Sequence, residues 1–161
     1  MTAKRAELFI KGEKEMIHFG GLLCDACDGN EVIYLHGELG AGKTTMVRGF
    51  IHQLGHTGAV KSPTYTLVEH YSYNDKTVYH FDLYRLGEAE ELEYMGIRDY
   101  FHRKAISLIE WPEKGRGYLP KADIDIKIYY EHEGQRRLHF EAVSRRGVLI
   151  FNALSGLYSA F

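Results

Sequence analysis

The chain of 161 residues contains little cysteine, little proline and no long hydrophobic run. Its two cysteines, Cys24 and Cys27, cannot make a disulfide framework. No apolar run reaches the roughly 18 residues that span a bilayer. The apolar stretch after residues 1–7 is too short for a signal peptide. These absences lead us to expect a cytoplasmic protein that does not enter a membrane.

The chain also lacks an excess of charge of either sign. It carries 20 basic and 22 acidic residues, a formal net charge of −2. A protein that binds nucleic acid by itself usually has a basic excess, so this balance disfavours an autonomous tRNA-binding protein. With 45% hydrophobic and 26% charged residues, the composition is that of an ordinary globular protein. The length predicts one domain over residues 1–161.

Apolar periodicity along the chain alternates between the strand and helix patterns, which predicts a layered α/β domain with a mostly parallel central sheet. Two antiparallel hairpins are expected, around residues 74–76 and around Glu133-Gly134. Cys24 and Cys27 lie near a buried helix stripe, so we expect them to pack in the core. We expect strands at 8–10, 32–35, 65–73, 77–83, 105–109, 123–130 and 137–143, and helices at 16–27, 43–54, 88–93 and 148–161.

A glycine-rich segment at residues 37–45 fits the pattern G-x-x-x-x-G-K-[ST], between a buried strand and an amphipathic helix. Glycines let successive backbone N–H groups turn toward a phosphate, and the helix N-terminus adds partial positive charge. Lys43 supplies a charge to the β- and γ-phosphates, and the Thr44 hydroxyl can reach Mg²⁺. We assign phosphate binding to Gly37, Glu38, Leu39, Gly40, Ala41, Gly42, Lys43, Thr44 and Thr45.

Two carboxylates follow predicted strands, where side chains at the carboxyl ends of a sheet face a bound ligand. Asp82 comes near the end of one strand and Glu110 directly follows another. Either can hold a metal or orient the attacking water, although each can also be an ordinary surface acid. Thr64, in the loop that begins at Ser62-Pro63, can lend a hydroxyl to the metal as switch loops do. A simple Ser-Pro turn is the alternative.

Four blocks in this order, at residues 37–45, 62–68, 80–86 and 109–112, resemble the TsaE (YjeE) family of small bacterial ATPases. The resemblance extends from about residue 8 to residue 143. It implies a P-loop NTPase-like fold and hydrolysis of ATP with Mg²⁺. It also implies partnership with TsaD and TsaB, which install threonylcarbamoyl on the adenosine next to the tRNA anticodon. The ATPase would reset the TsaD–TsaB complex and meet tRNA only through that complex.

The resemblance also assigns roles to single residues. Lys43 corresponds to a phosphate contact, and Thr44 and Glu110 correspond to metal-binding positions. Asp82 corresponds to the carboxylate that hydrolysis requires. Thr64 lies in the switch-like loop, Trp111 lies beside the active site, and Arg136 is the arginine expected to approach the nucleotide.

Two other functions share a phosphate loop. A nucleotide or small-molecule kinase would carry an arginine-bearing lid, but Arg98, Arg103 and Arg116 lie in no compact lid segment. A GTP-dependent switch would carry N-K-x-D and D-x-x-G blocks, and neither string occurs. Because no arginine finger is evident in the switch region, we expect slow hydrolysis by the isolated protein, and Arg85 is the nearest candidate for such an arginine in the sequence.

Overall fold

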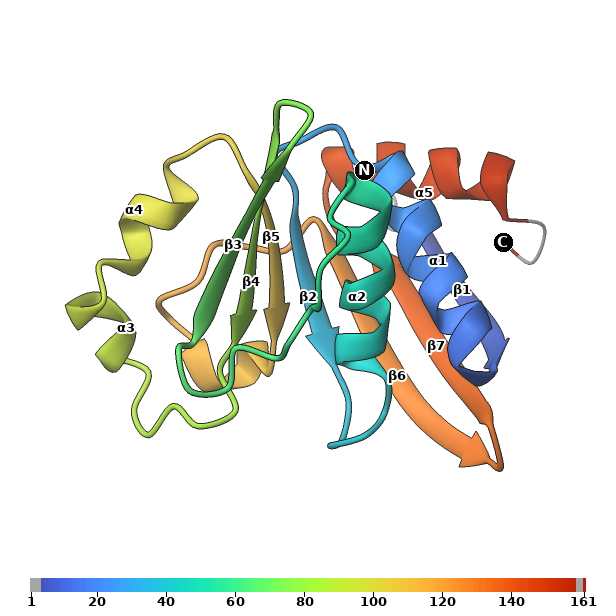
Figure 1. Ribbon diagram of the computed structural model, residues 1–161, viewed down its shortest axis with the longest axis horizontal. Coiled ribbons are helices and arrows are strands. Elements are labelled where there is room, and N and C mark those ends of the chain that lie inside the picture. The colour runs from blue at the N-terminus through green and yellow to red at the C-terminus, as the bar shows by residue number, and fades with distance from the viewer. Residues whose placement is uncertain (1–3, 159–160) are drawn as a thin grey trace.

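A seven-stranded mixed sheet forms the centre of the computed structural model, which describes residues 4–158 and 161 (Figure 1). Its strand order is β1-β7-β6-β2-β5-β4-β3. The central strand β2 runs parallel to β5 and β6, and β4 runs parallel to β5. The remaining neighbours are antiparallel. The strands are β1 (Lys4–Lys11), β2 (Val32–His36), β3 (Val68–Tyr73), β4 (Lys76–Asp82), β5 (Ile106–Glu110), β6 (Ile124–His132) and β7 (Gln135–Ala142).

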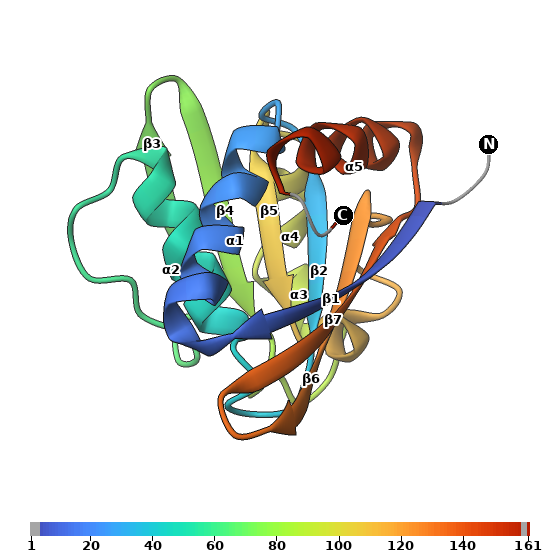
Figure 2. The same cartoon turned by 90° about the vertical axis from the view of Figure 1, so that its right-hand side faces the viewer.

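Helices cover both faces of this sheet (Figure 2). On one face α1 packs between α2 and α5, above a core drawn largely from β1, β2, β6 and β7. On the other face the short helices α3 and α4 cover β4 and β5. These elements are α1 (Gly12–Ala26), α2 (Lys43–Leu54), α3 (Glu91–Tyr94), α4 (Ile97–Phe101), α5 (Arg145–Leu157) and the 3₁₀ helix η1 (Pro112–Gly115). The expectation of an α/β fold with a parallel sheet centre is confirmed.

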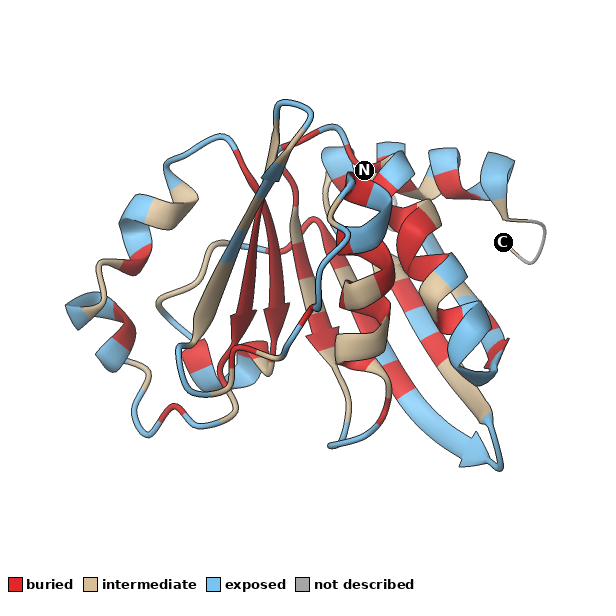
Figure 3. Ribbon diagram, in the orientation of Figure 1, coloured by how far each residue is buried: buried red, intermediate tan, exposed pale blue. Residues whose placement is uncertain are grey.

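The two sides of the sheet differ in how far their strands are buried (Figure 3). Every residue of β5 is buried, and the last five residues of β4 are buried too. By contrast, β1, β6 and β7 alternate between buried and more exposed positions over much of their length, because one face of these strands meets water. The parallel strands therefore carry polar groups into the protein interior, whereas the antiparallel strands present them to solvent.

Both predicted hairpins are confirmed. In the first, β3 and β4 pair across Asn74 and Asp75, whose positive φ values of 50° and 63° suit a tight hairpin turn. Its first strand begins at Val68, later than the predicted residue 65, because residues 64–66 form a turn. In the second hairpin β6 and β7 pair, with Gly134 in the turn.

The helices were predicted less accurately than the strands. The predicted helix at 88–93 is confined to α3, and the sequence patterns missed α4 and η1, which are too short to show a period. The predicted tail helix begins earlier, at Arg145, because the Ser144 hydroxyl caps it by accepting the Gly147 N–H at 2.9 Å. It ends at Leu157, and residues 159–160 of the predicted tail helix lie outside the described residues.

Cys24 and Cys27 are buried in the core at the end of α1, as expected. Burial raises the pKa of the Cys24 thiol to about 11, which keeps it protonated and unreactive near neutral pH. In the described part of the chain, no helix has the length and hydrophobicity that crossing a membrane requires.

Candidate functional site

The glycine-rich loop connects β2 to α2 at the carboxyl end of the central strand. Gly42 directly precedes the helix and has a φ of 115°, a left-handed conformation that a side chain would strain. A Cβ atom at this position would lie 3.0 Å from the Met16 Cε atom. The loop therefore delivers the unpaired N–H groups at the start of α2 to one concave surface, which is the arrangement that binds phosphate.

Lys43, the first residue of α2, lies folded back onto this loop. Its Nζ atom donates hydrogen bonds to the Gly37 carbonyl oxygen and, at 3.1 Å, to the Glu38 carbonyl oxygen. The ammonium lies 4.2 Å from the centroid of the Trp111 ring, within cation–π distance. Burial lowers the pKa of Lys43, while the negative charges of Glu110 and Asp82 oppose that shift. A phosphate would replace the two carbonyls as the partner of this charge.

Thr44 and Glu110 face each other across the bottom of the site. The Thr44 Oγ1 atom lies 3.3 Å from the Glu110 Oε1 atom and 3.2 Å from Oε2, and donates toward that carboxylate. Glu110 ends β5 and is only 2% exposed. The two residues predicted to bind metal are therefore neighbours, with one hydroxyl and one carboxylate converging.

Asp82 ends β4 and pairs in register with Glu110 on β5, so the two predicted carboxylates lie side by side. Its Oδ2 atom accepts hydrogen bonds from the Ser62 hydroxyl and, at 3.2 Å, from the Thr64 hydroxyl. Its Oδ1 atom accepts the Tyr84 N–H at 3.0 Å. The loop that carries Thr64 thus lies against the carboxylate that the sequence analysis selected.

Trp111 follows Glu110 directly and has a φ of 58°, which is uncommon for a residue with a side chain. This conformation turns the chain out of β5 into η1 and lays the indole beside Lys43. Arg136, from β7, reaches the opposite side of the loop. Its Nε atom donates to the Ala41 carbonyl at 2.9 Å and its Nη2 atom to the Gly40 carbonyl at 3.3 Å. Both predicted contact residues therefore adjoin the loop.

The chain is similar to known proteins over most of its length. Residues 10–138 match the profile of a family described as "Threonylcarbamoyl adenosine biosynthesis protein TsaE". The chain belongs to the TsaE family. The TsaE of Haemophilus influenzae, named a tRNA threonylcarbamoyladenosine biosynthesis protein, is 55% identical over 77% of this chain and 78% of that protein. The TsaE of Bacillus subtilis is 37% identical over 78% of each chain.

A solved structure shares this fold over nearly the whole chain. The chain matches the crystal structure of YdiB from Bacillus subtilis with a TM-score of 0.84 and 28% sequence identity, over 98% of each chain. The match extends beyond residue 143, so the shared fold includes the C-terminal segment for which the sequence alone offered no resemblance.

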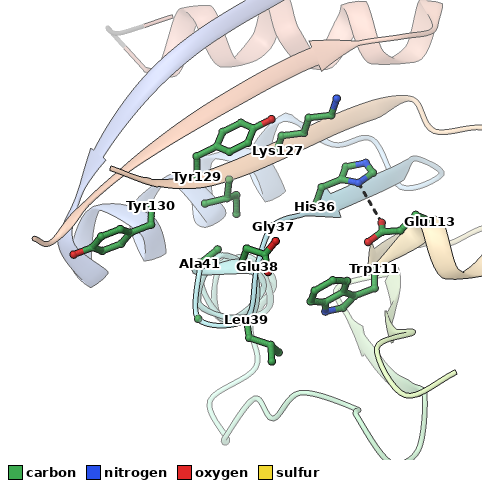
Figure 4. A pocket seen from close by; sticks show the side chains of 12 residues that line it. His36, Gly37, Glu38, Leu39, Ala41, Trp111, Glu113, Lys127, Tyr129 and Tyr130 are labelled. Atoms are coloured by element: carbon green, nitrogen blue, oxygen red, sulfur yellow. Dashed lines mark ion pairs between the residues drawn. The ribbon is translucent and has the colours of Figure 1, made fainter. Parts of the chain in front are cut away.

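Several hollows adjoin the phosphate loop of this TsaE chain. One of about 320 Å³ is lined by the loop, Thr64, Asp82, Glu110 and Trp111, and it adjoins the residues predicted to bind phosphate and metal. A second, of about 520 Å³, lies against the outer side of the loop and the β6 strand. In Figure 4, Trp111 and Tyr130 lie on opposite sides of loop residues 37–41.

The donor atoms in the smaller hollow suit Mg²⁺, which prefers oxygen ligands and retains water. A hydroxyl from Thr44 and a carboxylate from Glu110 supply such oxygens. Among the described residues, no group of three or more His, Cys, Asp or Glu side chains could hold a metal. A cation here would therefore need further oxygens, from water or from a phosphate, to complete its coordination.

Two residues of this site escaped the sequence analysis. His80 hydrogen bonds to Glu110, and the Ser62 hydroxyl lies closer to Asp82 than the Thr64 hydroxyl does. His80 could have been found from its position two residues before Asp82. Residues two apart on a strand project from the same face, and Asp82 was already a predicted site residue. No comparable signal separates Ser62 from an ordinary turn residue.

Proposed function

We propose that this TsaE chain is a Mg²⁺-dependent ATPase that supports threonylcarbamoylation of the adenosine next to the tRNA anticodon. Its ATP cycle resets the TsaD–TsaB complex between turnovers, and it meets tRNA only through that complex. Family membership supports the pathway. The observation that carries the catalytic part is the convergence of Lys43, Thr44, Asp82 and Glu110 on the hollow beside the phosphate loop.

The proposed reaction begins with binding of the ATP phosphates to the loop amides. Lys43 leaves the Gly37 and Glu38 carbonyls and pairs with the β- and γ-phosphates. Negatively charged phosphates then replace two neutral carbonyls as its partners. Thr44 and Glu110 would hold Mg²⁺, which supplies positive charge to the phosphate oxygens.

The water that attacks the γ-phosphate needs a group to orient it. Asp82 is the candidate for this role, because Ser62, Thr64 and the Tyr84 amide fix its carboxylate. Lys43 stabilises the charge that develops on the phosphate. Arg85 lies over the exposed Tyr65 ring, 4.5 Å from its centroid, and does not line the hollow, so we expect slow turnover until a partner completes the site.

Calorimetric titration with ATP and Mg²⁺ tests the phosphate site. The substitution Lys43→Ala should weaken ATP binding at least about 100-fold, because a buried charge is then lost from the phosphate cradle. The exposed Lys121→Ala is the matched control and should bind ATP as the natural protein does. An unchanged affinity in Lys43→Ala would contradict the assignment.

A second measurement tests the reaction and its partners. Phosphate release from ATP should be slow for the chain alone and should accelerate when TsaD and TsaB are added. Replacing Asp82 or Glu110 with alanine should remove that acceleration. Formation of ADP without free phosphate, in the presence of nucleosides or nucleotides, would instead favour the kinase alternative.

A further inference from the structure

We infer that His80 is a positioning residue for Glu110: its imidazole holds the carboxylate in the orientation in which it can serve Mg²⁺. The inference rests on the proposed function insofar as that function assigns Glu110 to the metal. The arrangement itself is a feature of the fold, made by two neighbouring strands beneath the phosphate loop.

The register of the sheet brings the two side chains together. His80 lies on β4 two residues before Asp82, and Asp82 pairs with Glu110 on β5. Alternate residues of a strand project to the same face, so His80 lies one step deeper than the two carboxylates on the face covered by α2. The side chains of His80 and Glu110 are 0% and 3% exposed. Bulk water therefore cannot take the place of the imidazole.

The hydrogen-bonding pattern gives the imidazole one partner. His80 Nε2 lies 2.5 Å from Glu110 Oε2, while His80 Nδ1 is buried with no hydrogen-bond partner among the described residues. A carboxylate oxygen accepts, so we assign Nε2 as the donor in this bond, and Nδ1 makes no hydrogen bond within the described part of the chain. An unpartnered buried nitrogen is unfavourable for folding. A core packing role would be served better by an apolar side chain, which points to a role for the one bond that His80 makes.

That bond determines what Glu110 can do. With Oε2 held by His80, the carboxylate is fixed beside the Thr44 hydroxyl, which it meets at 3.2 and 3.3 Å. The competing partner is Lys43, since Glu110 is the negative charge that acts most strongly on its ammonium. A carboxylate released from His80 would be free to turn toward Lys43 and away from the metal position. His80 thus keeps Glu110, the proposed metal ligand, away from Lys43, the proposed phosphate contact.

Matched substitutions separate the donor from the volume it fills. His80→Gln keeps an N–H donor at similar reach, whereas His80→Met fills a similar volume without one. Ser107→Ala is the control, because Ser107 is an equally buried polar residue on β5 that projects to the opposite face. Binding of a non-hydrolysable ATP analogue is measured by calorimetry in EDTA and across a Mg²⁺ titration, and Mn²⁺ binding to the complex is measured by electron paramagnetic resonance.

We expect His80→Met to raise the Mg²⁺ concentration for half-maximal analogue binding by about 10-fold or more, as for other residues that orient a metal ligand. The Mn²⁺ affinity should fall in parallel, and analogue affinity in EDTA should stay within about twofold of the natural protein. His80→Gln should restore the metal dependence to within about threefold, and Ser107→Ala should leave it unchanged. If His80→Met does not fold, His80→Asn, whose amide is too short to reach Glu110, takes its place.

The outcomes distinguish the inference from the proposed function. If the natural protein binds the analogue without any dependence on Mg²⁺, the metal assignment and hence the proposed function fail. If the natural protein depends on Mg²⁺ and the donor-free variant depends on it equally, only the role of His80 is overturned. Loss of analogue affinity in EDTA as well would also overturn it, because His80 would then support the fold of the phosphate loop instead of the metal ligand.

Discussion

The two halves of the sheet differ in how far their polar residues are buried. In β4 and β5 the residues His80, Asp82 and Glu110 are buried and fixed by named hydrogen bonds. In β6 and β7 the polar residues lie toward water, where Arg137 pairs with Glu131 at the surface. The parallel half therefore holds charged groups in the interior, whereas most charged groups of the antiparallel half lie near the surface.

This difference indicates which half of the sheet can hold catalytic or metal-binding groups. A buried carboxylate has few alternative partners, so it keeps the orientation that a metal or an attacking water requires. A solvated ion pair contributes little and adapts to its surroundings. Substitutions in the parallel half should therefore change the reaction itself, whereas substitutions in the antiparallel half should change affinity or nothing.

The largest effect is expected from Asp82→Asn, which keeps the shape of the side chain and removes its charge. We expect the hydrolysis rate to fall about 100-fold or more, because the group proposed to orient the water is lost, with ATP affinity within about threefold. Single-turnover hydrolysis and calorimetry measure the two quantities. The exposed Asp99→Asn is the control. Normal hydrolysis by Asp82→Asn would remove the basis for assigning the reaction to the buried half.

The next effect, on stability instead of rate, is expected from the helices that support the loop. A Cβ atom at Gly20 on α1 would lie 2.1 Å from the Met46 carbonyl oxygen on α2, a contact that requires backbone movement. We expect Gly20→Ala to destabilise the protein by about 3 kcal/mol, measured by urea unfolding. Gly156→Ala, where a Cβ would meet nothing within 4 Å, should instead gain about 0.5–1 kcal/mol. Equal stabilities would mean that α1 and α2 are not in close contact.

The smallest effect is expected from the antiparallel half. Arg136→Gln removes a positive charge and donors to the Gly40 and Ala41 carbonyls, so we expect ATP to bind about 3- to 10-fold more weakly with an unchanged Mg²⁺ requirement. The neighbouring Arg137→Gln is the control, because Arg137 projects to the other face and pairs with Glu131. An altered Mg²⁺ requirement in Arg136→Gln would blur the distinction between the two halves.

Much of the fold could be read from the sequence because its strands are long enough to show a period. The buried run of β5 and the alternation of β6 and β7 predicted strands of two kinds, and Asn74 with Asp75 predicted a turn. The short helix α4 was missed, and α3 was predicted only approximately, because one turn of helix has no measurable repeat. Their formation depends on Leu92 and Ile97 packing against the sheet.

The candidate site could likewise be predicted only in part from the sequence. The loop at residues 37–45, and the carboxylates that follow two strands, are set by local sequence, because a backbone turn and a helix start depend on neighbours along the chain. The tertiary structure was needed to show three hydrogen bonds: from Arg136 to the loop, from Ser62 to Asp82, and between His80 and Glu110. These contacts join distant parts of the chain, and their partners are determined by strand order and register.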